Sequence, residues 1–215
     1  MSLINILIQG GIAMVPLLGL SLVATALILE RIIFWRRISG RQKRLVREVL
    51  GLYRRSPKAA IDLLEKNADL PMARIFLAAL ELEQATPDEF RLALESAAQA
   101  EIPLLKRFNT FFETVISVAP LLGLLGTILG LIGSFASLRI GDLGGTQSAN
   151  VTAGISEALI STAAGLIVAI FTLLCANTFR GLYIRQIALI QEYGGQLELL
   201  HRRRYDRGTS PYAPT

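Results

Sequence analysis

The sequence predicts an all-α, polytopic membrane protein with three transmembrane helices, from which long helices extend into the cytoplasm. Its 215 residues are 52% hydrophobic, only slightly above the roughly 45–50% that is usual for soluble domains, so the distribution of apolar residues decides the class. Three long windows, residues 3–29, 114–138 and 150–178, contain either no ionisable residue or a single one. Lys and Arg gather between and after these windows. Because about 20 apolar residues cross a bilayer core, each window predicts a membrane span.

The first span lies within residues 1–35. Its apolar window is too long for the core of a cleavable signal peptide. Phe34 and Trp35 follow it, at the depth where aromatic side chains favour the membrane interface. Pro16 lies inside the window, and we expect neighbouring groups to satisfy the carbonyl that it leaves without a donor.

Residues 36–112 predict a cytoplasmic helical domain. Thr86-Pro87-Asp88-Glu89 has the residues of a capping box with proline at the first helical position, and Ser56-Pro57 is a similar helix start. The stretch that follows Thr86 is rich in helix formers and predicts a helix that runs into the second span. Pro103 should kink or interrupt this helix.

The second and third spans are predicted at residues 113–138 and 150–179, joined by a short periplasmic loop at 139–149 and followed by a cytoplasmic helix and tail at 180–215. The loop carries only Arg139, offset by Asp142. The positive-inside rule therefore places the N-terminus outside and the C-terminus in the cytoplasm. The basic residues that decide this flank the first span (Arg31, Arg36, Arg37, Arg41, Lys43, Arg44 and Arg47) and the third (Arg180, Arg185 and Arg202–Arg204).

Charge and residue usage argue against several classes of function. The net charge of +5 is explained by anionic membrane lipids beside the spans, so no nucleic-acid partner is expected. Cys175 is the only cysteine, and His201 is the only histidine. We expect Cys175 to be a buried small hydrophobe and His201 to be a solvated surface residue among arginines. Neither a metal site, a cofactor nor an enzyme activity is expected.

The second span has one face of small residues and one bulky face. The small face carries Thr127 and the glycines Gly123, Gly126 and Gly130, at spacings that place them on one side of a helix. In lipid, small residues let helix backbones approach closely. This face is therefore either a tight helix–helix seam, or part of it lines a narrow pore with Thr127 as its main hydroxyl.

The third span repeats this division and contains Glu157. Thr162 and Gly165 lie on the same face as Glu157. A carboxyl group within a span costs a few kcal/mol to insert, so it faces a bundle interior or a wet cavity, where the neutral form is favoured. Three interpretations stay open: proton or cation handling, a permanently protonated group that bonds to a neighbouring helix, and a simple charge at the mouth of a pore.

The two inner spans carry a family signature. SVAPLLGLLGTILGLIGSF and, across the loop, GISEALISTAAGLIVAI resemble the signature spans of the MotA/TolQ/ExbB proton-channel family. The number of spans and the predicted orientation are similar to its ExbB and TolQ members, whereas MotA proteins usually have four spans. The family pattern often has proline where this chain has Phe171, and Pro103 interrupts a helix expected to be continuous.

The resemblance implies a homopentamer around a central pore in the inner membrane of a Gram-negative-type bacterium. Inside the pore it implies the single-span helices of an ExbD- or TolR-like partner, whose aspartate is alternately protonated. Thr127 and Thr162 match the paired pore threonines of the family, and Glu157 matches its intramembrane glutamate. Gly123, Gly126, Gly130 and Gly165 are expected to pack the helices together. The complex would use the proton-motive force to drive a TonB-like protein.

Three functions are compatible with these residues. The first is an ExbB-like subunit that energises TonB-dependent transport across the outer membrane. The second is a TolQ-like subunit of an envelope motor, and the third is a passive membrane scaffold whose polar faces only hold helices together. The sequence leaves open the imported ligand, the number of partner copies and whether protons or sodium ions are coupled.

Overall fold

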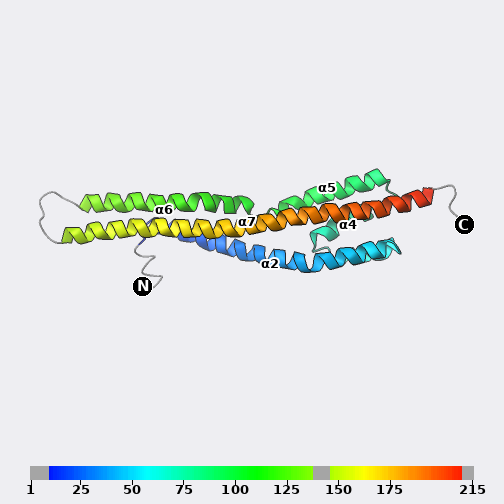
Figure 1. Ribbon diagram of the computed structural model, residues 1–215, viewed down its shortest axis with the longest axis horizontal. Coiled ribbons are helices and arrows are strands. Elements are labelled where there is room, and N and C mark those ends of the chain that lie inside the picture. The colour runs from blue at the N-terminus through cyan, green and yellow to red at the C-terminus, as the bar shows by residue number, and fades with distance from the viewer. Residues whose placement is uncertain (1–9, 138–145, 210–215) are drawn as a thin grey trace. The chain divides into compact units, whose positions relative to one another are not determined.

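The computed structural model describes residues 10–137 and 146–209, and its regular elements in this part of the chain are all helices. Their order is shown in Figure 1. The helices are α2 (Met14–Tyr53), α3 (Pro57–Glu65), α4 (Pro71–Leu80), α5 (Pro87–Leu105), α6 (Asn109–Ser137) and α7 (Thr146–Thr209). The all-α prediction is confirmed for these residues.

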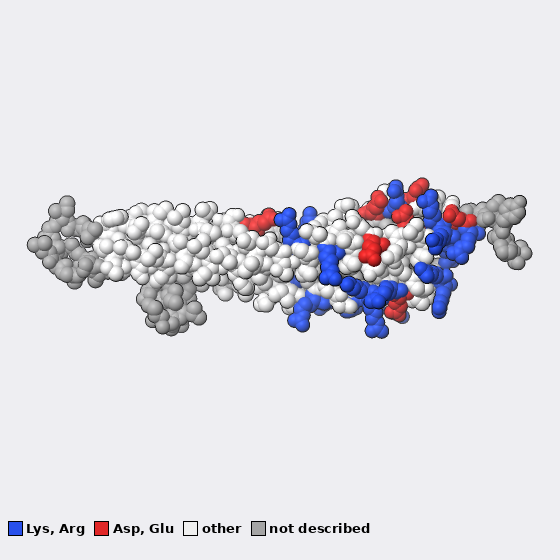
Figure 2. Space-filling model, viewed as in Figure 1, with Lys and Arg blue, Asp and Glu red and all other residues white. Residues whose placement is uncertain are grey.

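The chain divides into two compact units, and α2 and α7 contribute to both. Unit 1 contains residues up to Arg31 together with Phe108–Phe179, and unit 2 contains Ile32–Arg107 together with the residues from Arg180 onward. The face in Figure 2 shows Lys, Arg, Asp and Glu gathered on the helices of unit 2, while the helices of unit 1 are almost free of them.

Within the described residues, three stretches of helix are long and apolar enough to cross a membrane. They are Met14–Tyr53, Pro87–Ala136 (which contains α5, a short turn and α6) and Val151–Arg207. Large apolar side chains of unit 1 face outward, including Phe135 and Ile167, which are 68% and 67% exposed. Soluble proteins rarely expose so much contiguous apolar surface. The fold is that of a multi-pass membrane protein, and the prediction of three spans is confirmed at this level.

The core of unit 1 is formed by small and medium apolar side chains from three helices. Met14, Leu17 and Ala24 of α2 pack with Val115 and Ala119 of α6 and with Ala169 of α7. Helix α2 begins at Met14 after a turn in which Gly11 has a φ of 70°. Pro16 thus lies in the first turn of α2, where a backbone N–H has no intrahelical acceptor. No carbonyl of the helix therefore loses a hydrogen-bond donor to this proline, and the compensation expected from the sequence is not needed. Residues 3–9 of the first predicted window lie outside the described residues.

Unit 2 is a helical cluster around an apolar core of its own. Its fully buried side chains include Met72, Phe76 and Phe90. The capping box predicted at Thr86 is confirmed: Thr86 Oγ1 accepts a hydrogen bond from the Glu89 backbone N–H at 3.3 Å, and Glu89 Oε2 accepts one from the Thr86 N–H at 2.8 Å. The helix start at Ser56 is confirmed as well, since its hydroxyl oxygen accepts a bond from Ala59 N–H.

The helix that was expected to run into the second span is broken, but not at the proline. Pro103 lies inside α5. The break follows at residues 106–108, where Phe108 has a φ of 68°, and α6 begins at Asn109. Proline near a helix end removes one donor and weakens the last turn. The left-handed backbone of Phe108 turns the chain between α5 and α6, so the two helices do not form one continuous helix.

His201 is half-buried in unit 2, so the expectation of a solvated surface residue was wrong. Its ring stacks on Phe90 with the ring centres 4.0 Å apart. Nε2 lies 2.9 Å from the carbonyl oxygen of Ala85, and Nδ1 lies 2.9 Å from the hydroxyl of Tyr53. Leu197, four residues earlier, is fully buried and shares its helix face. Helical periodicity, and not the neighbouring arginines, therefore sets the environment of His201.

Candidate functional site

Helices α6 and α7 of unit 1 pack closely in antiparallel order along a seam of small residues. A Cβ atom added at Gly165 would lie 2.5 Å from the carbonyl oxygen of Ala119. One added at Gly123 would lie 2.9 Å from that of Ser161, and one added at Gly130 would lie 2.8 Å from that of Gly154. These three distances are all under 3.0 Å, and real Cβ atoms essentially never lie that close to another heavy atom. Only glycine permits this helix separation.

Gly126 completes the set of glycines that the sequence singled out, and it also faces α2. A Cβ atom at this position would meet the side chain of Ser161 on α7 and would lie 3.1 Å from the Cβ of Ala13, next to the start of α2. By contrast, Gly133 on the same helix has open space around it, with no atom within 4 Å of an added Cβ. The seam therefore needs particular glycines and does not involve every small residue of α6.

Thr127 and Thr162 meet across this seam. Their Oγ1 atoms contact each other directly. Thr127 Oγ1 also lies 3.2 Å from the carbonyl oxygen of Ala158, and Thr162 Oγ1 lies 3.0 Å from that of Gly123. Each hydroxyl has one hydrogen to donate. The pair can therefore adopt two arrangements, in which either threonine donates to the other while its partner donates to a backbone carbonyl of the opposite helix.

Two serines extend the hydroxyl row along the seam. Ser161 is 1% exposed and donates to the carbonyl of Ala158 at 2.9 Å. Ser134 is 3% exposed and donates to that of Gly130 at 2.9 Å. Both serines share the small faces seen in the sequence, but their depth of burial comes from the packing of α6 on α7. Hydroxyls satisfied in this way are compatible with a tight, partly polar interior.

Glu157 does not join the threonine pair. It lies five residues before Thr162 on α7, about 7.5 Å along the helix axis. It is half-buried and lines a cavity of about 500 Å³ together with Ile12, Gly130, Gly133 and Ser134. In the part of the chain that the structure describes, its carboxyl group makes no hydrogen bond or ion pair. A membrane-embedded carboxyl group needs such compensation, and the cavity beside Glu157 leaves space for a partner from beyond the described residues.

Gly11 is a site residue that the sequence interpretation missed. The carboxyl group of Glu157 packs directly against it, so that a Cβ atom at Gly11 would overlap Glu157 Oε1. The positive φ of Gly11 also favours glycine. The adjacent pair Gly10-Gly11 inside an otherwise apolar window was the signal that could have indicated a close approach of this kind.

Fold and site together define a multi-pass membrane protein with an acidic group and paired hydroxyls between its inner spans. The model of the MotA/TolQ/ExbB proton channel family matches residues 67–192 of the chain. This range includes Thr127, Glu157 and Thr162 and more than half of the chain. The chain therefore belongs to the MotA/TolQ/ExbB proton channel family, as the sequence resemblance predicted. Its members are transport proteins and not enzymes.

Individual relatives resemble the chain over most of its length. The ExbB-like 3 protein of Synechocystis sp. is 65% identical over 198 residues, which cover 92% of this chain and 94% of that protein. The biopolymer transport protein ExbB of Salmonella typhimurium is 32% identical over 142 residues, covering 62% and 57%. The Tol-Pal system protein TolQ of Haemophilus influenzae is 36% identical over 124 residues, covering 56% and 51%. Within the family, the chain is ExbB-like.

Proposed function

We propose that this protein is the ExbB-like subunit of a proton-driven motor in the inner membrane, which energises TonB-dependent transport across the outer membrane. In this proposal the chain is a homopentamer with its N-terminus in the periplasm and its C-terminus in the cytoplasm. The pentamer surrounds the single-span helices of an ExbD- or TolR-like partner. The partner's aspartate takes up and releases protons, and the resulting movement passes to a TonB-like protein.

One observation carries the proposal: the acidic group and the hydroxyl pair inside the spans of the α6–α7 hairpin. Glu157 is half-buried beside an open cavity with no partner among the described residues, which is a costly arrangement that functional sites retain. The threonine pair can reverse the direction of its hydrogen bonds without any movement of the helices. Both features support a polar route along which a proton is handled.

The need for a partner protein follows from the chemistry of the hydroxyl pair. The hydroxyls of Thr127 and Thr162 can pass a hydrogen bond but do not ionise near neutral pH. A proton carrier that alternates between two states has to be an ionisable group, and Glu157 lies about 7.5 Å along α7 from the pair. A second carboxyl group supplied by a single-span partner, as in the family, would complete the route.

A TolQ-like role in a Tol-Pal type envelope motor is the second candidate. The similarity to TolQ of Haemophilus influenzae, over half the length of that protein, favours it. The cellular partner separates the two candidates: purification of the chain from membranes should recover a TonB-like protein with an ExbD-like one, or a Tol-type partner with a TolR-like one. A passive scaffold is the third candidate, and the variants below separate it from both motors.

The test uses a strain in which this chain is the only source of the motor subunit and uptake through an outer-membrane transporter is measured. We expect Glu157→Gln to reduce energised uptake to the level of the deletion strain, because glutamine keeps the shape of the side chain but cannot carry a proton. Thr162→Val should do the same, since valine keeps the volume and loses the hydroxyl. Glu157→Asp should retain part of the uptake.

Thr178→Val is the matched control. Thr178 is exposed on α7 and donates only to the carbonyl of Leu174 within its own helix, so its loss should leave uptake unchanged. Each variant is also purified from membranes to measure assembly with its partner. If Glu157→Gln and Thr162→Val assemble normally and still support full uptake, the protein is a scaffold and the motor proposal is wrong.

A further inference from the structure

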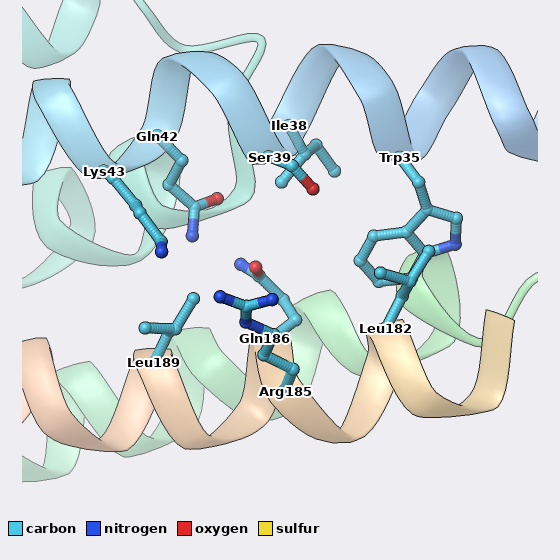
Figure 3. A pocket seen from close by; sticks show the side chains of 9 residues that line it. All are labelled: Trp35, Ile38, Ser39, Gln42, Lys43, Leu182, Arg185, Gln186 and Leu189. Atoms are coloured by element: carbon cyan, nitrogen blue, oxygen red, sulfur yellow. The ribbon is translucent and has the colours of Figure 1, made fainter. Parts of the chain in front are cut away.

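A second polar cavity lies in unit 2, between α2 and the part of α7 that follows Arg180. It has a volume of about 170 Å³, several times the roughly 30 Å³ that one water molecule occupies in the liquid. Figure 3 shows side chains from α2 pointing across this space toward side chains from α7. It is lined by Trp35, Ile38, Ser39, Gln42, Lys43, Leu182, Arg185, Gln186 and Leu189.

Two buried glutamines face this cavity with unsatisfied polar atoms. Gln42 is 2% exposed and Gln186 is 4% exposed. Gln42 Oε1 has no hydrogen-bond donor, and Gln186 Nε2 has no acceptor. A buried polar atom without a partner costs about 1–3 kcal/mol. Both atoms would be satisfied by a bound molecule that accepts a hydrogen bond from Gln186 Nε2 and donates one to Gln42 Oε1.

Two positively charged side chains, those of Lys43 and Arg185, also line this cavity. Lys43 and Arg185 are both exposed, and neither makes an ion pair within the described residues. Figure 3 shows their charged ends turned toward the glutamines. The described residues that line the cavity include no carboxylate. An anion in this space would meet two uncompensated positive charges and several N–H and O–H donors, and charge-assisted hydrogen bonds of this kind are the strong ones.

We propose that this cavity binds a phosphate group that also brings a hydroxyl hydrogen. The phosphate oxygens accept hydrogen bonds from Lys43, Arg185 and Gln186, and the hydroxyl donates to Gln42. Inorganic phosphate has such a hydroxyl, and so does a phosphoglycerol lipid headgroup. Sulfate has the same shape but carries no hydrogen at neutral pH, so it satisfies every lining group except Gln42.

The position of the cavity along the helices is compatible with both sources of phosphate. Gln42 lies seven residues after Trp35, about 10 Å along α2, and Gln186 lies six residues after Arg180, about 9 Å along α7. The headgroup layer is roughly 5–7 Å thick on each side of the apolar core. The two glutamines therefore lie a few ångströms beyond this layer, where soluble anions can reach them, and the cavity extends back to Trp35, within reach of a lipid headgroup.

The test uses Trp35, the only tryptophan of the chain, as a fluorescent reporter in the cavity wall. In one arm, inorganic phosphate is titrated into the full-length protein in neutral detergent, with sulfate at the same ionic strength as the comparison. In the other, the protein is placed in nanodiscs of phosphatidylcholine with or without phosphatidylglycerol. A saturable change with phosphate identifies a soluble ligand, and a change only with phosphatidylglycerol identifies a lipid; either result supports the site.

Variants decide whether the signal comes from this cavity. Lys43→Gln and Arg185→Gln each remove one charge-assisted bond and should weaken binding about tenfold or more, and Gln186→Leu should abolish it. Arg44→Gln is the matched control, because Arg44 is exposed on the same helix and does not line the cavity. The proposal is overturned if neither arm gives a response, if sulfate binds as well as phosphate, or if the response survives Lys43→Gln and Arg185→Gln.

Discussion

Two glycines of α6 and α7 have opposite surroundings, and they make a matched pair of substitutions. A Cβ atom at Gly165 would lie 2.5 Å from the backbone of α6, whereas one at Gly133 would meet nothing within 4 Å. We expect Gly165→Ala to destabilise the protein by about 1–3 kcal/mol, because the helices must separate to admit the methyl group. Gly133→Ala should be neutral or stabilising by up to about 1 kcal/mol, because alanine favours the helix. Apparent melting temperatures in detergent check both, and equal effects would contradict the described seam.

The hydrogen bond between Tyr53 and His201 predicts a dependence on alkaline pH. A carbonyl can only accept, so Nε2 of His201 donates to Ala85, and Nδ1 is then the ring nitrogen that can accept the Tyr53 hydroxyl hydrogen. Burial raises the pKa of Tyr53 above its ordinary value of 10.0, and the nearby charge of Arg204 opposes part of this rise. The protonated phenol is therefore favoured by folding. Its contribution is complete below pH 10 and is lost as pH rises through the folded pKa.

We expect Tyr53→Phe to cost about 1 kcal/mol of stability near neutral pH, the usual contribution of one hydrogen bond. The difference between wild type and variant should shrink as the pH rises above 10, since the wild-type phenol then ionises and loses the bond. Denaturant unfolding followed by Trp35 fluorescence at several pH values measures this difference. A difference that stays constant, or grows, at alkaline pH would show that the phenol does not donate to His201.

At the scale of elements, the register of α6 against α7 can be tested with a disulfide. Thr127 Oγ1 contacts Thr162 Oγ1, so the sulfur atoms of cysteines at these two positions would occupy neighbouring places across the seam. In a Cys175→Ala background, we expect the pair Thr127→Cys and Thr162→Cys to form an intramolecular disulfide on mild oxidation, detected as the loss of two hydrogens by mass spectrometry.

The control for this crosslink pairs Thr162→Cys with Leu129→Cys, because Leu129 is 43% exposed on α6 and lies off the seam. This pair should stay reduced or form dimers only between copies. If the control pair closes within one chain as readily as the threonine pair, the helices have a different register and the hydroxyl contact is absent.

At the scale of the whole molecule, unit 1 exposes too much apolar surface on its helices for a single copy in water. Phe135, Ile167 and Leu159 are 66–68% exposed and need lipid or further copies of the chain. We expect the protein purified in mild detergent to be a homopentamer. Native mass spectrometry measures the number of copies, and a monomer or dimer that is stable across several detergents would contradict the proposed assembly.

The amino-acid sequence by itself determined the class, the spans and the candidate residues of this protein. Long windows with at most one ionisable residue predict membrane helices, and helical periodicity places Thr127, Thr162 and the packing glycines on one face of each span. The capping box at Thr86 was equally readable, because its bonds join residues only three positions apart. Family signatures in the two inner spans then indicated the class of transport protein before any contact was known.

Only the tertiary structure decided which of these residues meet. The sequence could not show that Thr127 reaches Thr162 while Glu157 packs against Gly11, because contacts between distant residues depend on how helices pack. For the same reason it misassigned His201, whose surroundings come from Phe90, Ala85 and Tyr53. It also put the interruption of the long helix at Pro103, whereas the backbone turns at Phe108. Local patterns are set by bonds within a few residues, but burial and side-chain partners are set by elements that the chain brings together from far apart.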